Sequence, residues 1–170
     1  MRVSAEPLPV VAVGGGSVLL PDVPIRESAA FSRAAEDAGV DAVYIAPPSA
    51  AAETLDAVAA ASRGYVYAVS RVGVTGTERA SSTVGLAESV ERLRADAAAP
   101  VMLGFGISTP EQAWERITAG ASLLQGYTPF IYGGLGWIRG IHRGIAAQIK
   151  AHGLDSIEQA VGSGLEWKAL

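Results

Sequence analysis

The fold is decided at residues 103–112, LGFGISTPEQ, where an apolar strand runs into two glycines and then directly into a helix. Thr109 is the expected N-cap and Gln112 its capping-box partner, with a proline between them in the first turn. Gly104 and Gly106 leave room for a group to approach the backbone, and the amino end of a helix attracts anions. The stretch predicts a strand–helix unit with an anion site at the strand end. The alternative is that the glycines only permit a tight turn.

Elsewhere, short apolar runs alternate with longer stretches of helical periodicity. The runs expected to form strands are residues 7–15, 17–22, 41–46, 64–70, 99–105 and 121–127. The expected helices are residues 25–38, 49–62, 84–97, 110–119 and 136–151, with a short final helix from about residue 155. Gly39 is expected to end the first of these helices and Ser49 to cap the second. Ala87, Val90 and Leu93 are expected to form the inward stripe of the helix at 84–97. Strands that are apolar throughout are typical of parallel sheets covered on both faces. The order predicts an α/β fold: a parallel sheet of five to six strands with crossover helices.

The length of the chain limits how such a sheet can close. A closed eight-stranded barrel needs at least ~200 residues, and the chain has 170. We therefore expect a partial (β/α)8 (TIM) barrel, an open sheet derived from it, or a partial barrel completed by another chain. Residues 1–162 are expected to form a single α/β domain and residues 163–170 a tail, natural or artificial. The GGGS at 14–17 fits a natural phosphate loop, a tight hairpin or an artificial joint.

Composition excludes several classes of function. With 49% hydrophobic residues and a mean hydropathy of +0.29, the chain is expected to fold. The net charge of −4 and the lack of a basic stripe argue against binding nucleic acid or an acidic membrane surface. The absence of cysteine excludes disulfides, thiolate metal sites and a cysteine nucleophile. No apolar run approaches a spanning helix or a signal peptide, so a cytoplasmic protein is expected.

The strand after the opening stretch ends in QGYT, residues 125–128, which offers another small residue and another hydroxyl. Neighbouring strand ends of this kind form phosphate cradles in barrels. The sequence therefore predicts binding of a phosphate-bearing small molecule. The candidate residues on these two strand ends are Gly104, Gly106, Ser108, Gly126, Tyr127 and Thr128.

Other candidate groups leave alternatives open. Asp22 follows a strand and would serve as a base, bind a substrate N–H, or cap the following turn. His142 and His152 lack partners at metal-ligand spacing, so we expect surface histidines and no metal site. The long connection at 70–85 is rich in glycine and hydroxyl groups, which fits either a lid over the site or a solvated loop.

Four strings resemble the tryptophan synthase alpha subunit: LLPDVPIRESAAF, AVYIAPPSA, SRGYVYAVSRVGVTGTE and PVMLGFGISTPEQ. They cover about residues 18–112 and match the family from the end of its fourth strand to the start of the helix after its seventh. That family is a (β/α)8 barrel that cleaves indole-3-glycerol phosphate to indole and glyceraldehyde 3-phosphate. The resemblance implies that Gly76 and Gly106 contact phosphate through their backbone and that Thr75 supplies the hydroxyl of the active-site loop. It also places Asp22 and Tyr44 near the substrate pocket.

From about residue 113 to 162 the chain is similar instead to the carboxyl end of class 2 dihydroorotate dehydrogenases. The strings are AWERITAGASLLQGYTPFIYGGLGWIRGIHRGI and AHGLDSIEQAVGS, and PLPVVAVGG at residues 7–15 is also similar to that family. It is a (β/α)8 barrel too, and the resemblance implies that Gly126, Tyr127 and Thr128 hold an FMN phosphate. GFGI at 104–107 stands where that family has GVGGI. FMN is the one cofactor that the resemblance suggests. Because segments similar to two different families follow one another along the chain, the sequence indicates an engineered or recombined chimera.

The parts of the two families that carry their catalytic residues have no counterpart in this chain. The alpha subunit takes its two catalytic carboxylates from its second strand and the following loop, and the dehydrogenase takes its catalytic serine from upstream of the similar part. A phosphate cradle alone moves no proton, so we expect binding with little or no catalysis. The alternatives are a carbon–carbon lyase of tryptophan biosynthesis completed by a partner chain, and an FMN-binding flavoprotein. Open barrel edges predict a homodimer.

Overall fold

The computed structural model describes residues 16–48, 50–69, 86–96, 99–104 and 106–165. The strands are β1 (Ser17–Leu19), β2 (Asp41–Val43), β3 (Ile45–Ala46), β4 (Val66–Val69), β5 (Val101–Gly104) and β6 (Leu123–Gln125). The helices are η1 (Ile25–Glu27), α1 (Ser28–Asp37), α2 (Ala52–Ala61), α3 (Leu86–Asp96), α4 (Pro110–Thr118), α5 (Thr128–Ala151) and α6 (Ile157–Ala160). The predicted strand at 7–15 and the predicted lid at 70–85 lie outside the described residues.

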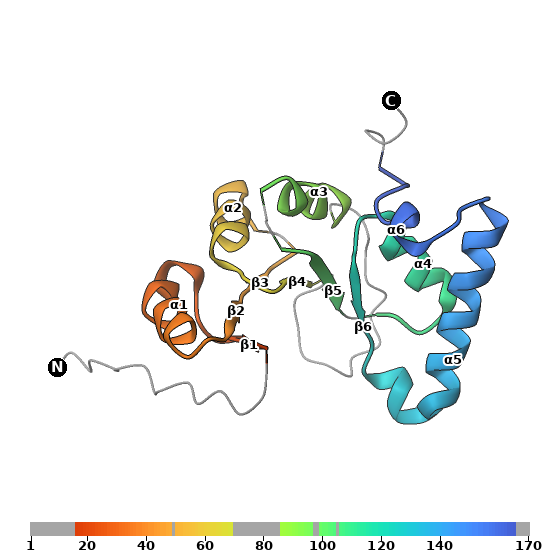
Figure 1. The fold of residues 1–170 in the computed structure, drawn as a ribbon, viewed down its shortest axis with the longest axis horizontal. Helices are drawn as coiled ribbons and strands as arrows, with labels where there is room; N and C mark the ends of the chain where they lie inside the picture. The colour runs from red at the N-terminus through yellow and green to blue at the C-terminus, as the bar shows by residue number, and fades with distance from the viewer. Residues whose placement is uncertain (1–15, 49, 70–85, 97–98, 105, 166–170) are drawn as a thin grey trace.

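The described strands pair in chain order, and every pairing is parallel. β1 pairs with β2, and β3, β4, β5 and β6 form a four-stranded sheet in that order. Figure 1 shows the strands following one another across the molecule, with α1, α2 and α3 along one side and α4 and α5 beyond β6. The predicted fold class is confirmed: a parallel α/β arrangement with crossover helices, consistent with a partial barrel.

The segment at 41–46 was expected to form one strand, and the structure divides it at Tyr44. Residues 41–43 pair with β1, whereas residues 45–46 pair with β4. The Tyr44 carbonyl also accepts a hydrogen bond of 3.2 Å from the N–H of Tyr67, in β4. One short segment is thus hydrogen-bonded on both of its sides, and it links the two-stranded ladder to the four-stranded sheet.

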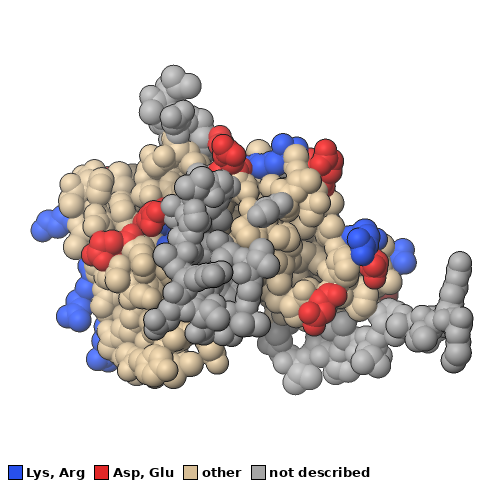
Figure 2. Space-filling model, turned by 180° about the vertical axis from the view of Figure 1, so that it is seen from behind, with Lys and Arg blue, Asp and Glu red and all other residues tan. Residues whose placement is uncertain are grey.

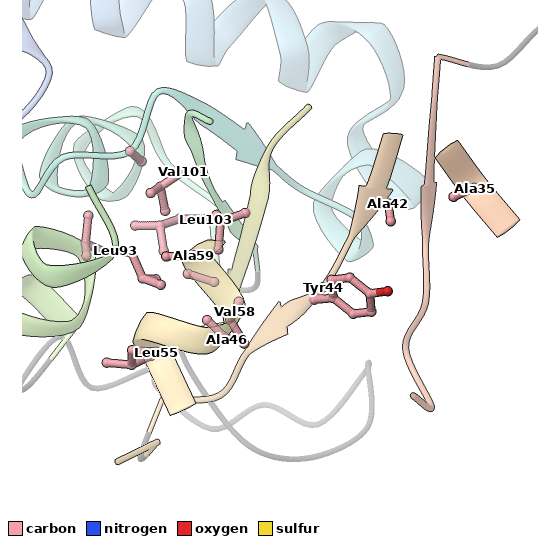
Figure 3. Packing of buried hydrophobic residues seen from close by; sticks show 14 residues of the cluster. Ala35, Ala42, Tyr44, Ala46, Leu55, Val58, Ala59, Leu93, Val101 and Leu103 are labelled. Carbon is pink, nitrogen blue, oxygen red and sulfur yellow. The ribbon is translucent and has the colours of Figure 1, made fainter. Parts of the chain in front are cut away.

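The main hydrophobic core lies between the strands and α1, α2 and α3. Figure 3 shows Leu55 and Val58 of α2 together with Leu103 of β5 and Leu93 of α3 in one cluster. Val90 and Leu93 lie on the predicted inward stripe of α3, and both are fully buried. Burial of a Val or Leu side chain contributes roughly 1.5–3 kcal/mol to stability. This core holds the strands in the register that defines the site.

Several predicted helix ends are confirmed, and others move. α1 is followed by Gly39 at φ +67°, which is the left-handed terminal glycine that the sequence predicts. α2 has Ala51 at its N-cap and no capping side chain, and the predicted cap Ser49 lies outside the described residues. The last long helix begins at Thr128 rather than at 136. It continues through one non-helical residue, Gly134, where the helix is kinked.

Among the described helices, none has the length and apolar character needed to cross a bilayer.

Candidate functional site

β5 and β6 end side by side at one edge of the four-stranded sheet. Gly104, the last residue of β5, lies opposite Gln125, the last residue of β6, and the two strands are parallel. The loops that follow, residues 106–109 and 126–127, therefore start from adjacent positions. Six of the predicted residues lie at these two strand ends and in the segments that follow them: Gly104, Gly106, Ser108, Gly126, Tyr127 and Thr128.

The loop after β5 carries two backbone N–H groups that no described residue accepts. Gly106 is exposed at φ +68°, a conformation that favours glycine, and the next side chain, Ile107, is buried against Ala113 and Ile141. That burial fixes the loop on α4 and α5. The N–H groups of Gly106 and Ile107 donate no hydrogen bond to any described residue. They are the groups of this loop best placed to bind an anion.

The amino end of α4, by contrast, is closed by its own side chains. Thr109 Oγ1 accepts the N–H of Gln112 at 3.3 Å, and Gln112 Oε1 accepts the N–H groups of Ser108 at 2.8 Å and Thr109 at 3.2 Å. The predicted capping box is confirmed. A hydrogen bond from the Thr109 hydroxyl, followed by the Glu111 backbone N–H, lowers the pKa of Glu111. This carboxylate stays ionised at neutral pH and opposes an anion at the helix end.

Trp137 of α5 joins the two loops, although no local sequence pattern singled it out. Its indole N–H donates a 2.9 Å hydrogen bond to the carbonyl of Ser108. A Cβ on Gly126 would overlap the same indole ring, so only glycine fits beneath it. Trp137 thus gives Gly126 a packing role. The signal in the sequence was a tryptophan in a glycine-rich helix, but its partners are far away in the chain.

A second aromatic residue, Tyr67 of β4, lies across the strand ends. A Cβ on Gly104 would overlap the Tyr67 hydroxyl, so this glycine makes room for the tyrosine ring. The Tyr67 hydroxyl donates a hydrogen bond to Gln125 Oε1. Burial raises the pKa of Tyr67, and the nearby Tyr65 adds to the effect. The three strands are therefore connected by a side-chain bond that passes over Gly104.

The remaining predicted residues lie elsewhere or outside the described part. Tyr44 is buried, and its hydroxyl lies 2.8 Å from Ser32 Oγ and donates to the Ser28 carbonyl at 3.2 Å. Figure 3 shows its ring directed away from Leu55 and Leu93. Asp22 is exposed in the turn after β1 and does not cap η1, whose N-cap is Pro24 without a capping side chain. Thr75 and Gly76 lie outside the described residues, so their roles stay predictions.

The described residues include no group of three His, Asp or Glu side chains placed to hold a metal ion. His142 is exposed. The ring of His152 lies 5.1 Å from that of Trp114, and its Nδ1 lies 2.9 Å from the Gln148 carbonyl. Both histidines are accounted for as surface residues of α5 and its end.

The family model described as "Tryptophan synthase alpha chain" matches residues 9–126. The tryptophan synthase alpha chain of Corynebacterium glutamicum is 57% identical over 109 residues, which cover 64% of this chain and 39% of that protein. The dihydroorotate dehydrogenase (quinone) of the same species is 57% identical over 107 residues, covering 62% of this chain and 28% of that protein. The two shares together exceed the chain, so the matched stretches overlap.

Among solved structures, tryptophan synthase from Mycobacterium tuberculosis in space group F222 superposes with a TM-score of 0.64 and 31% identity, over 79% of this chain and 51% of that one. The tryptophan synthase α2β2 complex from Pyrococcus furiosus gives a TM-score of 0.60 at 22% identity, over 76% of this chain and 53% of that chain, which supports the fold alone. The chain spans about two fifths of the tryptophan synthase alpha chains that it matches.

Proposed function

Because the chain belongs to the tryptophan synthase alpha chain family, we propose that it forms the phosphate-binding part of a (β/α)8 barrel. Residues 104–108 and 126–128 bind a phosphate-bearing small molecule, with Thr75 and Gly76 contributing from the connection after β4. The observation that carries this proposal is the pairing of Gly104 with Gln125. Because these residues end two neighbouring parallel strands, the loops that follow them start side by side.

The expected binding is weak. The contacts available are backbone amides of Gly106 and Ile107, the Ser108 hydroxyl, and the amino end of α5. No Lys or Arg occurs between Arg116 and Arg139 to add a charged contact, and the ionised Glu111 opposes the anion. An affinity in the millimolar range, on the order of −4 kcal/mol, fits such a contact set.

We propose further that this part of the barrel binds without catalysis. General acid–base chemistry needs a proton-transferring group within hydrogen-bond reach of the substrate. At this edge Tyr67 is committed to Gln125, and its raised pKa keeps it protonated at neutral pH. The Thr109 hydroxyl is likewise committed, to the capping box. The described residues of the edge therefore supply positioning and no general base.

Two alternative functions follow from the two sets of relatives. The first is a lyase acting on indole-3-glycerol phosphate, completed by a partner chain that carries the missing carboxylates. Release of indole from a mixture with such a partner would establish it. The second is a flavoprotein, for which the described edge fits only the phosphate end of FMN. A yellow purified protein with flavin absorbance would favour this second alternative. Our own proposal is that the protein holds no resident cofactor.

The origin and assembly of the chain belong to the same proposal. We infer that the chain is recombined or engineered, since two different families each match more than half of it but less than half of their own length. An incomplete barrel leaves sheet edges open, and a homodimer would cover them.

Phosphate binding is tested by titrating the protein with inorganic phosphate while following the 31P resonance. The variant Ser108→Glu places a negative charge at the loop after β5, and we expect it to weaken phosphate binding at least about tenfold. Ser122→Glu is the matched control, because Ser122 is exposed at the opposite end of β6. Equal affinities in the two variants, or no saturable binding to the wild type, would contradict the proposed site.

A further inference from the structure

Six large apolar side chains near the start of α5 are exposed. We call them the α5 patch, and their exposed fractions range from 41% to 87%: Leu123, Tyr127, Phe130, Ile131, Tyr132 and Leu135. Leu123 belongs to β6, Tyr127 is the N-cap of α5, and the other four lie in the first turns of that helix. Beyond the kink at Gly134, Trp137 and Ile141 pack into the cluster around Ile107 and hold the later turns of α5 in place.

The area of the α5 patch is large for a surface that stays in water. With about 200 Å² available for each large side chain, the exposed fractions correspond to roughly 700 Å². The largest apolar patch on a typical monomer is roughly 300–600 Å². Each partner in a standard-size interface buries about 800 Å². The summed exposed area of these six residues is therefore close to the area that one partner of a stable dimer contributes.

The charge distribution around the α5 patch favours a second copy of the same surface. No charged residue occurs between Arg116 and Arg139, so the segment that carries the α5 patch brings no charge of its own into such a contact. Figure 2 shows the end of the molecule with the first turns of α5 as tan surface, with blue groups further along the helix. The later turns of α5 carry Arg143 and Lys150, and α5 has no acidic residue. When two amino ends face each other across a twofold axis, these cationic turns lie at opposite ends.

The position of the α5 patch beside β6 is a second argument that it takes part in association. Within the described sheet, β6 is the last strand, and its outer edge pairs with no other described strand. Leu123 of this strand is part of the α5 patch. An open strand edge beside an apolar surface is a template for association, and a partner seated on the patch would shelter it.

We propose that the α5 patch is the surface through which two copies of this chain associate as a twofold-symmetric dimer. The inference rests on the homodimer in the proposed function and names its surface. It does not depend on phosphate binding, because the dimer is measured in phosphate-free buffer. A protein that dimerises but does not bind phosphate would contradict the phosphate site alone. A protein that binds phosphate but stays monomeric would contradict the dimer alone.

The first test is sedimentation velocity on the full chain at roughly 50 µM, a concentration suited to a micromolar dimer. We expect the wild type to sediment as a dimer. Ile131→Asp and Tyr132→Asp each put a carboxylate into the patch, and we expect each to weaken association at least about tenfold. Ala147→Asp is the control, because it adds the same charge to an exposed position of α5 outside the patch. Circular dichroism checks that all variants remain folded.

A monomeric wild type overturns the proposal, as does a dimer that survives both patch variants or is lost equally in the control. A second measurement covers variants that fail to fold. The chain has no cysteine, so a single introduced cysteine can form only an intermolecular disulfide. Tyr132→Cys is expected to cross-link under mild oxidation several times faster than Ala147→Cys. Equal cross-linking rates would contradict a patch-to-patch dimer.

Discussion

At the scale of single residues, two aromatic side chains account for glycines that had suggested room for a ligand. Tyr67 occupies the space above Gly104, and Trp137 occupies the space above Gly126. Of the glycines at the strand ends, Gly106 keeps a positive φ and an exposed backbone. The anion site therefore depends less on the number of glycines than on the amides of one loop.

Tyr67 predicts a pH effect on stability. Its pKa is raised above the ordinary value of about 10, so the folded state keeps the proton at a pH where the unfolded state has lost it. The unfolded state then binds fewer protons, and the free energy of unfolding falls as the pH rises above about 10. Below about pH 10 this contribution is constant.

Urea unfolding from roughly pH 8 to 11, across the ordinary tyrosine pKa, measures the effect. We expect Tyr67→Phe to lose less stability than the wild type over the alkaline part of this range, because it has no proton to lose there. Below about pH 10, the free energies of unfolding of the two proteins should change with pH in the same way. An alkaline loss that is the same in both proteins would show that Tyr67 is not its source.

At the scale of elements, α4 and α5 approach each other closely. A Cβ on Gly144 of α5 would overlap the ring of Pro110 at the start of α4. Ile107, in the loop before α4, is buried against Ile141 of the same helix. The helix after β6 thus holds the loop after β5, and the position of the candidate site depends on this contact.

Gly144→Ala is predicted to lower the free energy of unfolding by about 1–3 kcal/mol, because the added methyl group overpacks the contact. Gly140→Ala is the matched control one turn earlier, where a Cβ would meet nothing within 4 Å. Alanine has the higher helix propensity, so the control should be neutral or gain up to about 1 kcal/mol. The denaturant midpoints of the two variants, compared with that of the wild type, measure these changes in stability. Equal effects would mean that the contact does not limit packing.

At the scale of the whole molecule, stability should be highest at the centre of the sheet. All four residues of β4 are buried, and β4 and β5 each have a strand on both sides, whereas β6 has a described neighbour on one side alone. Local openings start where backbone hydrogen bonds are exposed and buried contacts are few. The edges of the sheet are such places.

Native-state hydrogen exchange tests this gradient. We expect the amides of β4 and β5 to exchange at least about tenfold more slowly than those of β1 and β6. The Ile131→Asp variant is the form to measure, because association would add protection near β6. Uniform protection across the strands would indicate that the molecule opens only as a unit.

The sequence by itself determined the features that depend on neighbouring residues. The parallel α/β order followed from apolar runs alternating with helical periods. The capping box of Thr109 and Gln112 and the terminal glycine Gly39 followed from residues a few positions apart. The adjacency of the two candidate loops followed from the order of their strands.

Only the tertiary structure decided which residues distant in the chain meet. Tyr67 bonds to a residue 58 positions away, and Trp137 bonds to one 29 positions away, so neither contact is encoded in a local pattern. The division of residues 41–46 at Tyr44 follows from pairing with two different strands. The α5 patch likewise arises because folding buries one side of the helix and leaves the other in water. Contact and burial are properties of the packed chain, and periodicity and capping are properties of its short segments.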